Sequence, residues 1–68
     1  MRGVGSIIDE CGVIARDGAD TIFRREQGGR FMLEAAELRE DLIGRRVAIH
    51  GILIAKATVL VERLTVQP

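Results

Sequence analysis

Hydrophobic residues are most concentrated near the end of the chain, in two stretches separated by Ala55-Lys56-Ala57-Thr58. The stretches cover residues 47–55 and 59–66, and Val, Ile and Leu dominate both. Because β-branched side chains fit a pleated, half-buried surface, the two stretches predict a β-hairpin. The connection has either two or four residues, and because it lacks the Gly or Asn that two-residue turns favour, we expect the four-residue loop.

This loop would place Ile54 opposite Val59 and Ile52 opposite Val61. One face of the hairpin, the expected core face, then carries Val47, Ile49, Leu53, Leu60, Leu64 and Val66. The other face carries Ala48, His50, Ile52, Ile54, Val59 and Val61. Since the core face would also hold Glu62, we expect a β-bulge near Gly51 or Glu62, which would exchange the two faces beyond it.

The N-terminal part of the chain predicts two further strands. Residues 3–16 contain two short apolar pieces around Gly12, which is typical of one long strand bent at the glycine. The dipeptide Asp17-Gly18 predicts a tight turn, and residues 21–26 then form the second strand.

The third strand follows Gln27-Gly28-Gly29, where paired glycines predict a tight hairpin turn. It covers residues 30–36, and we expect Phe23 from the second strand to join its inward side chains in the core. By the two-residue period of a strand, these are Phe31, Leu33 and Ala35.

Residues 37–43 predict a helix of about two turns. Leu38 and Leu42 recur at helical spacing with charged residues between them, and Gly44 follows as a C-cap. A helix this short is stable only when it packs against the rest of the fold.

Three strands, a short helix and two strands form the element order of the OB-fold, a small five-stranded Greek-key barrel. The alternative is an SH3-like barrel, which lacks a helix of this length between the third and fourth strands. We therefore expect an all-β, OB-like barrel that forms a single domain over residues 1–68.

The stretch GGRFMLEAAELREDLIGRRVAIHG and the later VERL carry a recurring pattern. Its pieces are the run Leu42 to Val47, the spacing Val47-x-Ile49-x-Gly51 and an ending on Val61, Glu62 and Leu64. From about residue 28 to residue 64, this pattern resembles a small bacterial family of domains of unknown function. The resemblance implies an OB-like fold and supplies no catalytic residues, so it leaves the function open.

The 68 residues include ten basic and ten acidic side chains, so the formal net charge is zero. A balanced charge removes the overall electrostatic argument for binding nucleic acid or anionic lipid. The single Cys fits a reducing compartment, and no apolar run reaches the roughly 18 residues of a membrane span. We expect a cytoplasmic protein without a signal peptide and without membrane contact.

Residues that could support catalysis or metal binding are sparse. His50 is the only histidine, and no other His or Cys lies near it in sequence to complete a zinc site. The carboxylates Glu34, Glu37, Glu40 and Asp41 fit a solvated helix face, with Glu37 near the helix N-terminus. We therefore expect no catalytic residue, no metal and no cofactor, and a protein that is not an enzyme.

Three arginines form the main candidate site. Arg24, Arg25 and Arg30 fall on the predicted second and third strands, which form the nucleic-acid-binding face of OB-folds. Base stacking needs aromatic side chains beside them, but the chain has no Trp or Tyr and both Phe are expected in the core. The arginines are therefore either ordinary surface residues or contacts for weak, non-specific binding of single-stranded nucleic acid.

Whether or not the expected β-bulge is present, the hairpin directs a row of apolar side chains outward. Since soluble monomers seldom expose large apolar patches, we expect a homo-oligomer or a protein partner to cover this row. The alternative is that the segment around Ile7-Ile8 folds back over it. The expected function is a non-enzymatic interaction or structural module, with weak nucleic-acid binding as the alternative. The candidate contact residues are Ile52, Leu53, Ile54, Val59 and Leu60.

Overall fold

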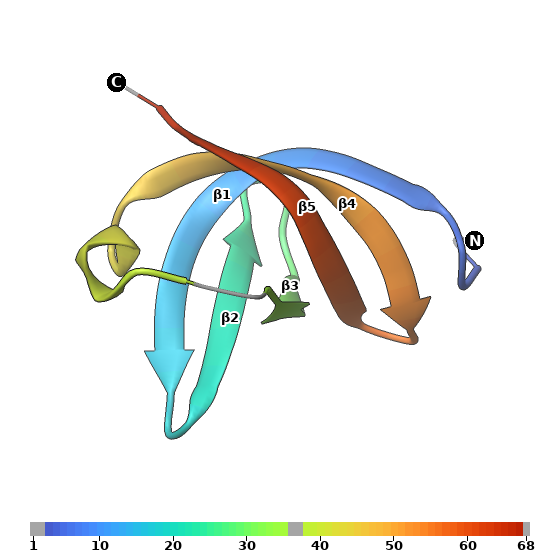
Figure 1. Ribbon diagram of the computed structural model, residues 1–68, viewed down its shortest axis with the longest axis horizontal. Coiled ribbons are helices and arrows are strands. Elements are labelled where there is room, and N and C mark those ends of the chain that lie inside the picture. The colour runs from blue at the N-terminus through green and yellow to red at the C-terminus, as the bar shows by residue number, and fades with distance from the viewer. Residues whose placement is uncertain (1–2, 36–37, 68) are drawn as a thin grey trace.

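All five strands predicted from the apolar pattern are present in the computed structural model, which describes residues 3–35 and 38–67 (Figure 1). The all-β class is therefore confirmed. No helix in this described part of the chain has the length and apolar character to cross a membrane. The strands are β1 (Ile7–Asp17), β2 (Asp20–Arg25), β3 (Arg30–Glu34), β4 (Arg46–Ala55) and β5 (Thr58–Val66).

The strands form one sheet in the order β1-β2-β3-β5-β4, and β4 pairs back with β1. The hydrogen-bonded ladder therefore runs around a closed ring. All neighbouring strands are antiparallel except β3 and β5, which are parallel. The long strand β1 closes the ring because residues 7–13 pair with β4 and residues 12–17 pair with β2.

Gly12 lies where β1 passes from one neighbour to the other, as the bent first strand predicted. A Cβ atom at this position would overlap the carbonyl oxygen of Arg24 and lie 2.8 Å from Cζ of Phe23. Only a residue without a side chain lets β2 and the core approach β1 this closely.

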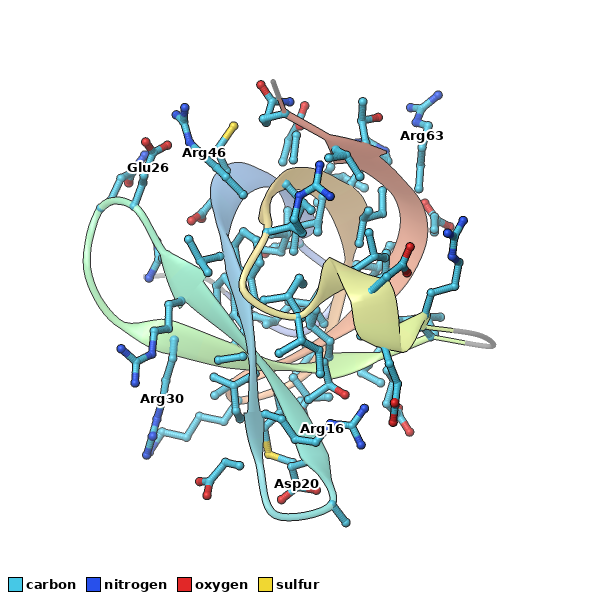
Figure 2. All side chains as sticks on the ribbon, turned by 90° about the vertical axis from the view of Figure 1, so that its left-hand side faces the viewer. Arg16, Asp20, Glu26, Arg30, Arg46 and Arg63 are labelled. Carbon is cyan, nitrogen blue, oxygen red and sulfur yellow. The ribbon has the colours of Figure 1, made fainter. Side chains whose placement is uncertain are left out.

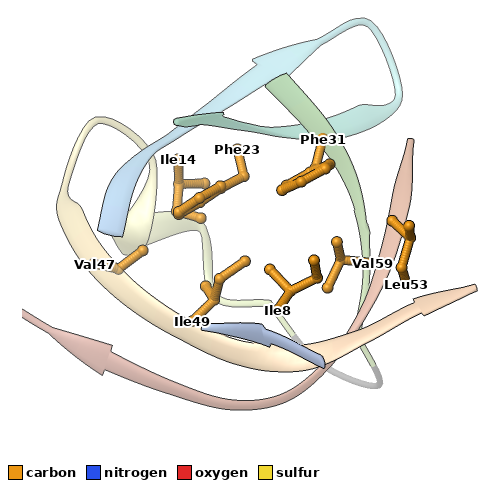
Figure 3. Packing of buried hydrophobic residues seen from close by; sticks show 8 residues of the cluster. All are labelled: Ile8, Ile14, Phe23, Phe31, Val47, Ile49, Leu53 and Val59. Atoms are coloured by element: carbon orange, nitrogen blue, oxygen red, sulfur yellow. The ribbon is translucent and has the colours of Figure 1, made fainter. Parts of the chain in front are cut away.

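The core fills the inside of the ring, and Figure 3 shows its side chains converging from all five strands. Phe23 and Phe31 are buried there, as predicted, and Leu33 packs against the cluster. The buried cluster consists of Ile8, Ile14, Phe23, Phe31, Val47, Ile49, Leu53 and Val59.

The helix predicted over residues 37–43 is wrong for the residues that the structure describes; Glu37 lies outside them. This segment holds only a 3-10 turn, η1 (Glu40–Leu42), and the residues on either side, Arg39 and Ile43, are extended. Leu38 and Ile43 pack against the core without a helix between them. A helix of two turns is marginal, and tertiary packing therefore decides the local conformation.

The four-residue loop predicted between the last two strands is also wrong. Ala55 pairs with Thr58, which leaves a two-residue turn at Lys56-Ala57. No described residue other than glycine has a positive φ, so this turn is not one of the mirror-image types that match the strand twist. The register shifts at Ile54, directly beside the turn.

The bulge predicted near Gly51 or Glu62 is confirmed. His50 pairs with Arg63 and Gly51 pairs with Val61, so Glu62 is the extra residue on β5. Between this bulge and Ile54, the register differs by one residue from the predicted one, and Leu53 pairs with Val59.

The shifted register exchanges the two faces of β5 over residues 59–61, which corrects the predicted division of the hairpin there. Val59 is fully buried, whereas Leu60, expected in the core, is exposed. Beyond Glu62 the predicted register holds and Leu64 packs against the core, but Val66, also expected in the core, is exposed at the end of the strand. The faces predicted for β4 hold, since Val47, Ile49 and Leu53 are buried.

Candidate interaction surfaces

The outer face of β1, β4 and β5 carries three neighbouring apolar side chains, which we call the apolar row. Ile7 on β1 pairs with Ile52 on β4, and Ile52 pairs with Leu60 on β5. Cross-strand partners project from the same face of a sheet, so the three side chains form one continuous row. Ile7 is 61% exposed and Leu60 is 41% exposed, with Ile52 half-buried between them.

Two of the five residues predicted to mediate self-association lie inside the ring. Leu53 and Val59 belong to the buried core, so their side chains are not available for a surface contact. Ile54 is exposed at the end of β4, beside the hairpin turn. The surface candidates are therefore Ile52, Ile54 and Leu60, and sequence reasoning did not include Ile7 among them.

The segment around Ile7-Ile8 does not cover the apolar row, contrary to the alternative considered from the sequence. The N–H of Gly5 donates to the carbonyl of Leu53 at 2.6 Å, and the N–H of Leu53 donates to the carbonyl of Ser6 at 2.9 Å. These residues therefore continue beside β4 in the plane of the sheet. Ile8 enters the core, and Ile7 becomes part of the row.

A charged row lies next to the apolar row on the same face. Asp9 on β1 pairs with His50 on β4, and His50 pairs with Arg63 on β5; all three line one shallow hollow. His50 Nδ1 lies 3.9 Å from Asp9 Oδ2, and its Nε2 lies 4.0 Å from Glu62 Oε1. Arg63 forms no ion pair with any residue that the structure describes. The row thus has a negative side chain on β1 and an unpaired positive one on β5.

A shallow groove on the outer face of β1, β2 and β3 brings three arginines together. Arg24 and Arg30 are cross-strand partners, and Arg16 and Asp17 line the same groove. Arg16 approaches Glu40 at 3.8 Å, whereas Arg24 and Arg30 have no ion-pair partner within residues 3–35 and 38–67. Like charges directly opposite each other weaken strand pairing, so a bound anion between these two arginines would be stabilising.

Arg25, the third predicted nucleic-acid contact, faces into the ring. Its Nε donates to Glu10 Oε1 at 2.7 Å and its Nη2 donates to Glu10 Oε2 at 3.1 Å, which is a bidentate ion pair. The guanidinium carbon also lies 4.8 Å from the centre of the Phe31 ring. Because the Glu10 side chain is only 6% exposed, this pair is part of the folded interior. The Arg25 guanidinium is therefore already paired with a carboxylate within the fold, unlike those of Arg24 and Arg30.

A second ion pair ties the turn after β2 to the start of β4. Arg46 Nη2 donates to Glu26 Oε1 at 2.6 Å (Figure 2). This hydrogen bond and the negative charge of Glu26 raise the pKa of Arg46. Since arginine is already charged throughout the physiological range, the raised pKa creates no pH switch.

The described parts of the chain, residues 3–35 and 38–67, hold no cluster of three His, Cys, Asp or Glu side chains suited to a metal ion. His50 has a carboxylate on each side, but its two nitrogens face different carboxylates and so do not converge on one point. Among the carboxylates noted in the sequence, Glu34, Glu40 and Asp41 are exposed, and Glu37 lies outside the described residues. The expectation that the protein is not an enzyme stays a prediction.

Five strands in one hydrogen-bonded ring, with a charged and an apolar row on its outer face, define a small all-β protein. A model of a family of proteins of unknown function, DUF5818, matches residues 11–66. Because this match covers most of the chain, the protein belongs to that family. The resemblance to a family of unknown function is thereby confirmed at this level. No curated protein and no solved structure matches the chain.

Proposed function

We propose that the chain is an OB-like barrel that acts as a non-enzymatic interaction module, associating with itself through the apolar row. The path of the chain supports the OB-like assignment. Turns join β1, β2 and β3, and β4 then returns to lie beside β1, which is a Greek-key path. The final strand β5 completes the ring between β3 and β4.

The exposed apolar row is the observation that carries the proposed function. Ile7, Ile52 and Leu60 are direct neighbours on three adjacent strands, so their apolar surface is continuous. Contiguous apolar surface, unlike single scattered apolar side chains, is typical of interaction sites. A chain of this length also buries a small fraction of its surface on folding, and association would add to that burial.

The test replaces Leu60 with lysine and measures molar mass by light scattering at tens of micromolar. Leu60 pairs with Glu34 on β3, so a lysine at this position gains a favourable neighbour within the fold. We expect the wild type to exceed the 7.5 kDa of one chain and Leu60→Lys to approach it, because the charge would be desolvated in the contact.

Val13→Glu is the matched control. Val13 is similarly exposed, on the part of β1 that pairs with Arg24 and Arg46, away from the apolar row. This variant should keep the wild-type mass. A wild type that stays at 7.5 kDa, or a Leu60→Lys protein that keeps the larger mass, would contradict the proposal.

Weak binding of single-stranded nucleic acid is the second candidate function, and the groove with Arg16, Arg24 and Arg30 favours it. The groove lies over β2 and β3, where OB-folds bind oligonucleotides. Its described lining contains no aromatic side chain for base stacking, since Phe23 and Phe31 are buried in the core. Binding through a few arginines alone would be non-specific and weak in physiological salt, and its dependence on salt would be shallow because few counterions are released.

An Arg24→Gln/Arg30→Gln double variant tests this second candidate by titration with a single-stranded oligonucleotide at low salt. The wild type should bind weakly, the double variant should lose this binding, and Arg45→Gln, which changes an exposed arginine outside the groove, should retain most of it. Sub-micromolar, sequence-dependent binding by the wild type in physiological salt would place this function above self-association.

A further inference from the structure

We propose that the apolar row and the charged row together form a self-complementary surface, which pairs two copies of this chain about a two-fold axis along β4. The inference rests on the proposed self-association and specifies its geometry. Strand β4 lies in the middle of this face, with β1 on one side and β5 on the other. The rotation therefore places β1 of each copy on β5 of the other. It also places the apolar row of one copy on the apolar row of the other, and the charged row on the charged row.

The apolar contacts of this arrangement are self-complementary. Ile52 meets Ile52 of the second copy at the axis, and Ile7 meets Leu60 of the second copy on both sides of it. In an isologous interface, a residue that contacts a second residue of the other copy is itself contacted in the same way across the axis. The three apolar side chains find apolar partners under this symmetry. All three are close neighbours within one copy, so the apolar contact is continuous across the axis.

The charged row selects this orientation. The same rotation places Asp9 of each copy opposite Arg63 of the other, so opposite charges meet twice. Asp9 is 76% exposed, and Arg63 has no ion pair with any described residue of its own copy, so both side chains are available. Glu62, the remaining acid beside this row, lies near His50.

A two-fold axis that crosses the strands between the two rows is disfavoured by the same residues. That rotation would place the apolar row of each copy on the charged row of the other. Asp9 and Arg63 would then lose water without gaining a partner of opposite charge, which is costly. The alternation of an apolar and a charged row therefore favours the axis along β4.

The curvature of the ring limits the strength of this contact. A specific interface of ordinary size buries about 800 Å² on each partner, and a convex outer face brings fewer side chains together than a flat one. We therefore expect dissociation in the micromolar range, with the charge pairs contributing orientation and dependence on salt more than affinity.

Charge reversal with mixing tests the arrangement. In a dimer of Asp9→Arg chains, each of the two Asp9–Arg63 contacts becomes a contact between two arginines. In a dimer of Arg63→Glu chains, each becomes a contact between two acids. Each variant alone should dimerise roughly tenfold more weakly than the wild type. When the two variants are mixed, both contacts join opposite charges, and sedimentation equilibrium should show a heterodimer close to wild-type affinity. The Asp9→Arg/Arg63→Glu double variant should also regain self-association.

Asp20→Arg is the matched control, because it makes the same charge change in the hairpin between β1 and β2, far from Arg63 (Figure 2). It should leave dimerisation unchanged. If Leu60→Lys abolishes the dimer but mixing restores nothing, the arrangement about β4 is wrong and the proposed self-association stands. If the wild type forms no dimer, both are wrong.

Discussion

At the scale of single residues, the pair of Glu10 and Arg25 separates what the sequence could predict from what it could not. Strand alternation from Ile8 places Glu10 on the inner face of β1, and alternation from Phe23 places Arg25 on the inner face of β2. An inward charge requires a counter-charge nearby, so an internal ion pair could have been predicted. The sequence could not show that Glu10 and Arg25 are the partners in this ion pair. Their pairing depends on the register between β1 and β2, in which Gly12 pairs with Arg25.

Replacing Glu10 with glutamine keeps the shape of the side chain and removes its charge. The Arg25 guanidinium would then be partly buried without a counter-charge, and we expect the free energy of unfolding to fall by about 1–3 kcal/mol. This is less than for a fully buried pair, because the Arg25 side chain is 23% exposed. Urea denaturation monitored by circular dichroism gives the value.

Glu26→Gln provides the control for this stability measurement. It also removes one acid from an arginine pair, but both Glu26 and Arg46 are half exposed, so we expect a clearly smaller loss of stability than for Glu10→Gln. Equal effects of the two substitutions would show that the Glu10–Arg25 pair behaves as a surface ion pair, against our interpretation.

At the scale of elements, the hairpin of β4 and β5 shows the limit of local patterns. The alternation of apolar residues predicted both strands and a bulge, and Glu62 indicated its position because an acid would otherwise face the core. The second irregularity, at Ile54, has no comparable signal in the sequence, because an apolar residue at this position fits either face of the strand. The predicted faces of β5 were therefore reversed over Val59 and Leu60.

Gly51 lies at a close approach of β4 to β5, and it gives a prediction for this element. A Cβ atom there would overlap the carbonyl oxygen of Leu60 and lie 3.0 Å from Cγ1 of Val59. We expect Gly51→Ala to lower the free energy of unfolding by about 1–3 kcal/mol and Gly51→Val by at least as much, through overpacking.

Gly3→Ala serves as the control for Gly51, since no atom lies within 4 Å of a Cβ at Gly3. Thermal melting of the three variants gives the comparison. A Gly51→Val protein that melts like the wild type would mean that the two strands do not pack as closely as described.

The segment between β3 and β4 illustrates a different limit. Leu38 and Leu42 have helical spacing, but over so few residues the same spacing also fits an irregular chain that packs apolar side chains at intervals. Long-range contacts decide between them: Leu38 and Ile43 pack on the core, and the N–H of Gly44 donates to the carbonyl of Ile14 at 2.7 Å. Such contacts depend on residues distant in sequence, so no local pattern could predict them.

At the scale of the whole molecule, the closed ring determines how the protein can associate. Each of the five strands pairs on both sides over part of its length, and segments such as residues 61–66 of β5 have one neighbour only. Because the ring leaves only such short edges for strand addition, we expect association through the outer faces or the open ends of the ring. The sequence could predict an outward apolar row, but not its completion by Ile7, because that depends on the pairing of β1 with β4.

The most direct test of self-association is the molar mass of the wild-type chain as a function of concentration, measured by sedimentation equilibrium. We expect a mass that rises from 7.5 kDa towards twice this value over the micromolar range. Added salt should weaken the association only partly, because apolar contacts provide most of the buried surface. A mass that stays at 7.5 kDa up to several hundred micromolar would contradict the proposed self-association.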